Sequence, residues 1–357
     1  MFKKITASAR GAGSRLTTGW KDWRSDMAES NRWFGIGAGV IGVYLFVALV
    51  LGVIWSFEPE PFDVREAAVR EVGGDESRLV TGVITTSALI NVVDTMLNKR
   101  GGYLSNDVAP PGVWLDNIPN WEYGVLIQVR DLTKAMREAY SRSQSQSTED
   151  KDLAAAEPQF NFDNSNWLLP ATEKEYGEGV VALRAYLKRL SDPNEPSAQF
   201  YTRADNLNYW LSTVETRLGS LSQRLSASVG QRRLNTDLAG SPGAANATRL
   251  PEEMEVKTPW MEIDDVFYEA RGTSWALIQF FRAMEIDFAD VLEKKNAVVS
   301  VQQIVRELEG TQQTVYSPMI LNGNGFGMLA NHSLVMANYI SRANAAIIDL
   351  RELLKQG

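Results

Sequence analysis

Three segments of this chain combine aromatic rings, carboxylates and amides, which is the mixture that proteins use to bind sugars. The segments are residues 101–124, 160–170 and 199–210. Aromatic rings stack on the apolar face of a sugar, and glycoside hydrolysis needs two carboxylates roughly 5–10 Å apart, without histidine or cysteine. The candidate catalytic carboxylates are Asp116, Glu122, Asp163 and Asp205, and the candidate ligand-binding rings are Tyr103, Trp114, Trp121 and Trp167.

The same residues also have a purely structural interpretation, which the pattern favours. Loops that cross the end of a helical bundle bury aromatic rings, and they use Asp or Asn to cap the helices that follow. The spacing of the carboxylates matches no catalytic motif, and no glutamate lies in a Ser- or Gly-rich motif like that of lytic transglycosylases. We therefore favour a non-enzymatic protein and leave an enzymatic activity open.

Composition excludes several kinds of site. The chain has no cysteine, one histidine (His332) and a net charge of −8. Disulfides, thiolate catalysis and zinc–cysteine sites are thereby excluded, and a histidine-rich metal site is impossible. The acidic balance argues against nucleic acid as a partner, because nucleic-acid binding requires a basic surface. We expect no metal or cofactor, and we expect His332 to be a packing residue.

Residues 33–55 form a run of 23 residues without a charged side chain, bounded by Trp33 and Trp55. A helix of roughly 20 apolar residues crosses a bilayer, and tryptophan prefers the membrane boundary. The preceding residues carry seven Lys or Arg against three acids, whereas the residues just beyond the run are mostly acidic. Because basic flanks stay in the cytoplasm, we expect an uncleaved signal anchor with the bulk of the chain outside, which in a Gram-negative bacterium is the periplasm.

Gly35 and Gly39 form a G-x-x-x-G pattern within this run, and Gly42 shares their helix face. Small residues allow two membrane helices to approach closely. The pattern is compatible with a homodimer, or with an accessory subunit of a membrane transporter.

The order of these features predicts four parts of the chain. They are a cytoplasmic basic tail (1–32), a transmembrane anchor (33–55), an extended linker (56–62) and a periplasmic helical domain (63–357), with mobile loops near 143–158 and 230–258.

Heptad spacing predicts the architecture of the large domain. Apolar residues from Phe200 to Leu225 alternate at spacings of four and three, which gives an a/d seam for packing against another long helix. Residues 263–288 and 329–354 repeat this spacing, and no segment alternates convincingly as a strand. We predict an all-α fold, with one transmembrane helix and an elongated bundle of long antiparallel helices with coiled-coil-like seams.

Local signals predict where several helices begin. Asp63 is expected to cap a first short helix, Asn120 to cap a helix over 121–143, and Thr172 to open a helix that ends near Leu190. Three prolines in residues 103–120 argue against helix there.

Several loop motifs resemble an uncharacterised proteobacterial family of single-pass inner-membrane proteins, domain of unknown function 2333. The motifs are GGYLSND (101–107), PPGVWLDN (110–117), PNWEYGVLIQVRDL (119–132), SRSQSQS (141–147), QFYTRADNL (199–207) and RLGSLSQRLSASVG (217–230). The resemblance implies a Gram-negative source and an inner-membrane address, and it supplies no catalytic residues.

We predict a non-enzymatic scaffold or adaptor that is anchored in the inner membrane and docks other envelope proteins. The alternatives are a peptidoglycan-binding or peptidoglycan-cleaving protein that uses the aromatic-carboxylate loops, and an accessory subunit of a transporter. The peptidoglycan interpretation requires the three loops to meet at one open cleft.

Overall fold

The computed structural model describes residues 34–142, 148–192, 194, 198–234, 253–317, 319–323 and 328–356. The chain forms two compact units that divide between Ile54 and Trp55. The predicted basic tail and Trp33 lie outside the described residues.

The first unit contains the helix Phe34–Trp55, which is long and apolar enough to cross a membrane. Its most apolar 18-residue window has a mean hydropathy of 2.5, and 6% of that window is buried. Gly35, Gly39 and Gly42 lie on this helix, and a Cβ at each would meet no other atom within 4 Å.

The second unit, which begins at Trp55, is a helical domain with one small hairpin. Its helices are α2 (Val64–Glu71), α3 (Val83–Asn98), α4 (Asn117–Ala135), α5 (Lys151–Phe160), α6 (Thr172–Leu190), α7 (Ala204–Ser226), α8 (Ile263–Asp287), α9 (Ala289–Lys294), α10 (Val298–Gly310) and α11 (His332–Lys355). A π-helical turn, Met136–Tyr140, extends α4, and strands β1 (Gln231–Leu234) and β2 (Glu253–Val256) pair antiparallel. The predicted all-α class is confirmed.

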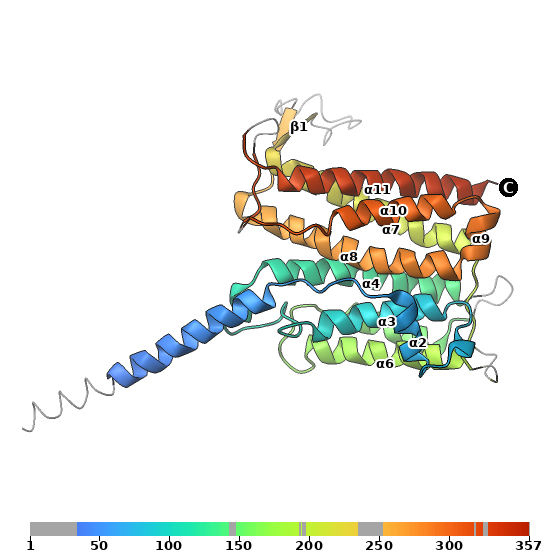
Figure 1. Cartoon of the computed structure of the whole chain (residues 1–357), viewed down its shortest axis with the longest axis horizontal. Helices are drawn as coiled ribbons and strands as arrows, with labels where there is room; N and C mark the ends of the chain where they lie inside the picture. The colour runs from blue at the N-terminus through green and yellow to red at the C-terminus, as the bar shows by residue number, and fades with distance from the viewer. Residues whose placement is uncertain are drawn as a thin grey trace, which may run out of the picture. The chain divides into compact units, whose positions relative to one another are not determined.

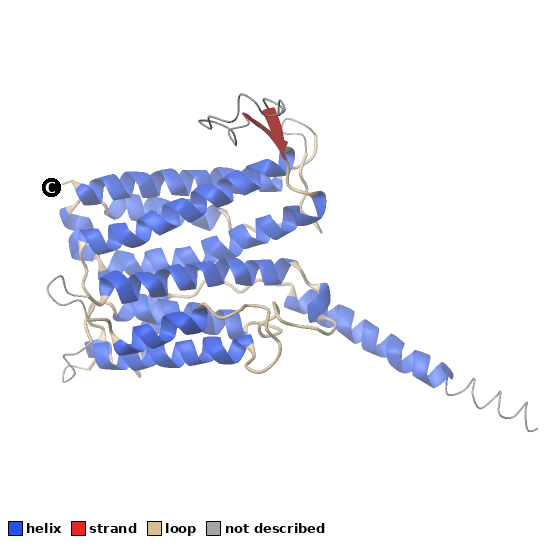
Figure 2. Ribbon diagram, turned by 180° about the vertical axis from the view of Figure 1, so that it is seen from behind, coloured by secondary structure: helices blue, strands red, loops and turns tan. Residues whose placement is uncertain are grey.

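The long helices lie side by side in layers around a central pair, α4 and α8 (Figure 1). Helices α3, α5 and α6 pack on one side of this pair, and α7, α10 and α11 pack on the other (Figure 2). One continuous apolar core runs through both sides and includes the fully buried rings of Trp121, Trp210 and Trp275.

Two glycines allow the central helices to approach closely. A Cβ at Gly124 would lie 2.2 Å from the carbonyl oxygen of Glu269, and one at Gly272 would lie 2.0 Å from that of Trp121. Asn120 in the first turn of α4 donates to Asp265 in the first turn of α8, and beyond their ends the ring of Tyr140 packs on that of Phe288. The central pair therefore runs parallel, contrary to the predicted antiparallel bundle, whereas α7 and α11 run antiparallel as predicted.

The predicted seam is buried from Leu207 through Val214 to Leu225. Helix α7 begins at Ala204, however, so Phe200 lies in the loop before the helix and packs on Gly82.

The main partner of α7 is α11, and polar contacts flank the seam. Arg351 donates to Asn208 at 2.9 Å near the start of α7, and the Ser341 hydroxyl meets Ser222 near its end.

Two segments that were predicted as mobile loops contain regular structure. Helix α5 occupies residues 151–160, within and just beyond the predicted loop near 143–158, because Asp150 caps it and Leu153, Ala156 and Phe160 are buried. The β1–β2 hairpin lies within the predicted loop near 230–258, and residues 235–252 are outside the description.

Two predicted helix caps are wrong and one is confirmed. Asp63 accepts from the backbone N–H groups of Arg65 and Glu66, as expected. Helix α4 begins at Asn117 with Asp116 as its cap, because Pro119 in the first turn needs no N–H partner. Thr172 opens α6, which ends at Leu190 as predicted, but it does not cap the helix, because its hydroxyl donates instead to the carbonyl of Asp163 at 2.8 Å.

The connections between helices gather at two ends of the domain. The α3–α4, α5–α6, α7–α8 and α10–α11 connections lie at one end, where the ring of Trp55 packs on Gly101 (Figure 1). The connections before α3, before α7 and around α9 lie at the other, where Phe200 packs on Gly82. We call these the Trp55 end and the Phe200 end.

Candidate functional site

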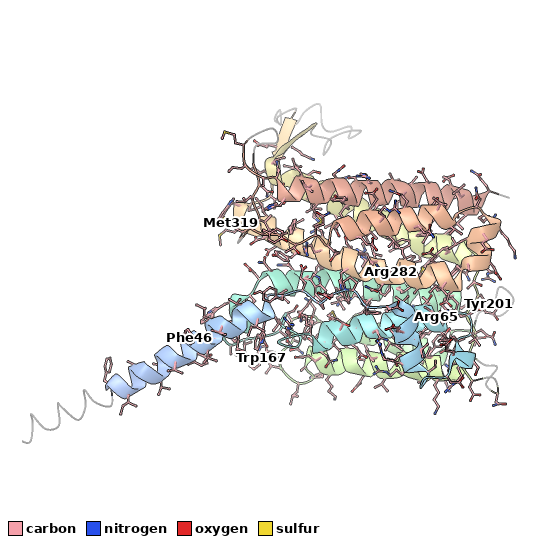
Figure 3. The ribbon with its side chains drawn as sticks, viewed as in Figure 1. Phe46, Arg65, Trp167, Tyr201, Arg282 and Met319 are labelled. Atoms are coloured by element: carbon pink, nitrogen blue, oxygen red, sulfur yellow. The ribbon has the colours of Figure 1, made fainter. Side chains whose placement is uncertain are left out.

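Two of the three aromatic-carboxylate loops meet at the Trp55 end, and the third does not join them. The hydroxyl of Tyr103 donates to the carbonyl of Asn164 at 2.8 Å, and the amide of Asn106 donates to the carbonyl of Asn166 at 3.1 Å. The third loop is at the Phe200 end, where Tyr201 N–H donates to the Tyr140 carbonyl at 2.7 Å (Figure 3). The 16-residue helix α3, about 24 Å long, separates the two ends.

Glu122 holds the α3–α4 connection from inside the core. Its side chain is fully buried and forms an ion pair with Lys99, whose side chain is 2% exposed. It also accepts hydrogen bonds from the backbone N–H groups of Leu104 and Ser105, both at 2.8 Å, and from the Ser105 hydroxyl. A carboxylate with this many donors is a structural anchor of the loop.

Burial and pairing act in opposite directions on this ion pair. Burial raises the pKa of Glu122 and lowers the pKa of Lys99, whereas their mutual attraction and the hydrogen bonds from Ser105 and Leu104 oppose these shifts. Removing either partner would leave the other charge buried without its counterion, which is costly.

The other three candidate carboxylates also have local structural roles. Asp116 caps α4 by accepting from the backbone N–H of Asn117 at 2.9 Å. Asp163 closes a turn by accepting from both the N–H and the hydroxyl of Ser165, each at 2.9 Å. Asp205 is exposed in the first turn of α7, at the Phe200 end. The four carboxylates therefore do not line one cleft.

The four candidate rings divide into two buried and two exposed residues. Trp121 is fully buried and packs on Trp275, so it lies in the core and does not line a groove. Tyr103 is 4% exposed and packs edge-on against Tyr176. Trp114 and Trp167 are 54% and 58% exposed on the two converging loops.

His332 begins α11 and packs as predicted. Its Nδ1 accepts from the backbone N–H of Leu321 at 3.0 Å, and its ring lies 6.5 Å from that of Phe267, centroid to centroid. Among the described residues, no group of three or more histidine, aspartate or glutamate side chains is placed to hold a metal ion.

A hollow of about 320 Å³ lies between α8, α10 and α11, close to the Trp55 end. Its wall is mostly apolar and aromatic, with Phe267 from α8 and Tyr339 and Met336 from α11, and Tyr316 stands exposed at its margin. Pockets with apolar walls and a few polar groups are the usual binding places for ligands or partner side chains.

Arg271 of α8 lines this hollow and binds both the linker before α2 and the start of the α10–α11 connection. It is 8% exposed, and its guanidinium binds both carboxylate oxygens of Glu58 at 2.7 and 2.8 Å. It also donates to the carbonyls of Thr311 and Gln313, at 3.0 and 2.8 Å. The linker is thereby fixed to α8 and to the start of the α10–α11 connection.

A family model described as an uncharacterised protein conserved in bacteria, DUF2333, matches residues 27–357. The chain belongs to this family. The resemblance that the loop motifs carried is thus confirmed, and it covers the N-terminal helix and the whole helical domain. No curated protein and no solved structure matches the chain.

The sequence of this DUF2333 member signals some of the anchoring residues but not their partners. Glu122 was selected from the sequence as a candidate catalytic carboxylate, whereas its partner Lys99, 23 positions earlier at the end of α3, was not selected. Arg271 was also missed. Its signal was a charged residue directly before the uncharged run 272–281 of α8, since a charge beside a buried run is usually paired when it is itself buried.

Proposed function

We propose that this DUF2333 protein is an inner-membrane-anchored scaffold or adaptor of the Gram-negative cell envelope, with its helical domain in the periplasm. The observation that carries the proposal is the helix Phe34–Trp55, which has 22 residues, a mean hydropathy of 2.5 and a 6% buried window. A helix of this length and polarity is suited to lipid, and a folded domain follows it directly.

Charge supports the orientation. Lys and Arg outnumber acids by seven to three in residues 1–32, and acids predominate in the first 20 residues beyond Trp55. Basic segments are retained in the cytoplasm, so the helical domain would be exported.

The anchoring roles of the carboxylates support docking over catalysis. Glu122 pairs with Lys99 and accepts hydrogen bonds from the α3–α4 connection, whereas Asp116 and Asp163 accept from backbone N–H groups of their own turns. These side chains hold their own loops in place and are not free for chemistry on a substrate. We place the docking of a partner protein at the hollow between α8, α10 and α11, whose walls fit an apolar or aromatic side chain.

A reporter fusion tests the anchor and its orientation. Alkaline phosphatase fused after Gln356 should be active in intact cells, and green fluorescent protein at the same position should be dark after export through the general secretory route. The opposite pattern of activities would contradict the proposal.

Cross-linking tests the adaptor role. The full chain, cross-linked in membranes and purified, should recover a defined envelope protein. Val335→Arg places a charge at the hollow and should lose that protein, because Val335 is 56% exposed and lines the hollow. The matched control is Val181→Arg, on the 67% exposed Val181 of α6, which should retain the partner. Recovery of nothing but the chain itself would count against an adaptor.

A further inference from the structure

The Trp55 end carries exposed apolar side chains on every one of its four connections. The α5–α6 connection has Trp167 and Leu169, which are 58% and 94% exposed, and the turn before α4 has Val113 and Trp114 at 52% and 54%. The turn before α8 and the α10–α11 connection add four more: Trp260 and Met261, at 76% and 80%, and Met319 and Leu329, at 55% and 65%.

The described connections at the Phe200 end expose fewer large apolar side chains, although Val299 in the first turn of α10 is 74% exposed. Among the described residues of its connections, Val80 alone is an exposed large apolar side chain, at 44%. Trp167 and Met319 stand at one end of the helical domain and Tyr201 at the other (Figure 3). Solvent-facing loops are normally polar, so apolar residues on four separate loops of one end indicate a common apolar neighbour.

Trp55 joins the apolar helix to this end of the second unit. Trp55 is the last residue of the apolar helix, and a Cβ at Gly101 would lie 2.7 Å from its ring. Glu58, three residues later, is fixed to the buried Arg271. Three residues span at most about 11 Å, so the linker cannot carry the Trp55 end far from the end of the apolar helix.

We propose that the Trp55 end rests on the bilayer surface, with the apolar tips of its connections inserted among the lipid headgroups. The inference rests on the proposed membrane anchor. Tryptophan and tyrosine prefer this interface, and leucine, valine and methionine gain by burial beneath it. Four separated tips fit a soft lipid surface better than one rigid partner face.

The end is not basic. Asp116, Asp264 and Asp265 lie beside one another there, and burial and mutual repulsion raise the pKa of Asp265 to about 6. Docking would therefore depend on apolar insertion, and zwitterionic phosphatidylcholine should suffice without anionic lipid.

The absence of cysteine from the chain makes a site-specific test simple. Full-length single-cysteine variants would carry an environment-sensitive nitrobenzoxadiazole dye in phosphatidylcholine nanodiscs with one chain per disc. Val113→Cys, Leu169→Cys and Met261→Cys report on three connections of the Trp55 end. Val80→Cys and Val299→Cys, at exposed positions 44% and 74% accessible near the other end, are the matched controls.

The three labels at the Trp55 end should have blue-shifted emission and lose most of their fluorescence to spin-labelled phosphatidylcholine, while both controls are unaffected. Equal quenching at all five positions, or none at the three, would overturn the inference. A blue shift and lipid quenching that appear only with two chains per disc, or only with anionic lipid, would also overturn the inference. A chain that does not enter discs would contradict the anchor itself, which separates the two failures.

Discussion

At the Trp55 end, the ring of Trp55 fills the space beside Gly101, and at the Phe200 end the ring of Phe200 fills the space beside Gly82. Both glycines have a φ of +90°, in the left-handed region that disfavours side chains. Each end also has a carboxylate that accepts from two backbone N–H groups of a distant segment. Glu122 accepts from Leu104 and Ser105, and Asp287 accepts from Gly82 and Thr85.

The two ends differ on the outside. Every connection at the Trp55 end exposes apolar side chains, whereas Val80 is the single large example among the described connections at the Phe200 end. Since the Phe200 end is closed by similar internal contacts without such residues, folding does not require them. The difference is what motivates the proposed lipid contact of the Trp55 end.

The largest effect is expected from breaking the buried ion pair. Lys99→Met would leave the charge of Glu122 buried without its counterion, and should lower the free energy of unfolding by about 3–5 kcal/mol. Chemical denaturation of the full chain in detergent measures this change in the free energy of unfolding. Asp287→Asn at the other end keeps an acceptor and should cost about 1–2 kcal/mol.

The matched control is Lys174→Met, because Lys174 is 65% exposed in an i,i+4 pair with Glu178 and should contribute less than about 1 kcal/mol. A cost for Lys99→Met no greater than that of Lys174→Met would refute the anchoring role of Glu122.

The second effect concerns the close approach of α4 and α8, which lies in their halves nearer the Trp55 end. Gly272→Ala would press a methyl group onto the Trp121 carbonyl and should destabilise the domain by about 1–3 kcal/mol. Gly177→Ala on α6 meets no atom within 4 Å and should stabilise it by up to about 1 kcal/mol through helix propensity. Thermal unfolding of both variants measures the contrast, and equal shifts would refute the tight crossing.

The third effect is a pH dependence at the Trp55 end. Burial, with repulsion from Asp264, Asp116 and Glu262, raises the pKa of Asp265 from 3.8 to about 6. The folded state therefore binds this proton more tightly than the unfolded state, and its contribution to stability is lost as pH rises from about 4 through 6.

Asp265→Asn should be more stable than the parent above pH 6, on the order of 1 kcal/mol after allowance for solvent screening, and equal to it below pH 4. Unfolding across this pH range measures the difference. A variant that is less stable than the parent at pH 7 would show that the carboxylate is favourable there.

The smallest effect on stability is expected at the exposed tips. Leu169→Glu and Val299→Glu should each change the free energy of unfolding by less than about 0.5 kcal/mol, because both side chains are exposed. In nanodiscs, Leu169→Glu alone should reduce lipid quenching of a label at Val113→Cys. Equal reductions by both substitutions would remove the distinction between the ends.

The sequence predicts periodic and uncharged segments well. The uncharged helix and the α7 seam from Leu207 to Leu225 follow directly from spacing and composition. Helix α5 was missed because its polar residues and Pro158 obscure a buried face of Leu153, Ala156 and Phe160.

The burial and partners of the candidate site residues were less predictable, because they depend on contacts between distant segments. Trp121 and Trp114 look alike in sequence, yet one is in the core and the other is exposed. Glu58 and Arg271 are 213 residues apart, and no local pattern joins them. Leu168 and Leu169 are recognisable in the sequence as apolar residues before Pro170. Only the fold shows that they lie at the same end of the domain as Met261.

Photo-cross-linking in native membranes tests the central claim most directly. A phospholipid with a diazirine in its headgroup region would be activated in membranes that contain the unmodified chain, and labelled peptides would be identified by mass spectrometry. We predict labelled peptides from residues 99–116 and 161–171 and none from residues 74–82 or 288–297. Equal labelling of both sets, or labelling of the second set alone, would contradict the account.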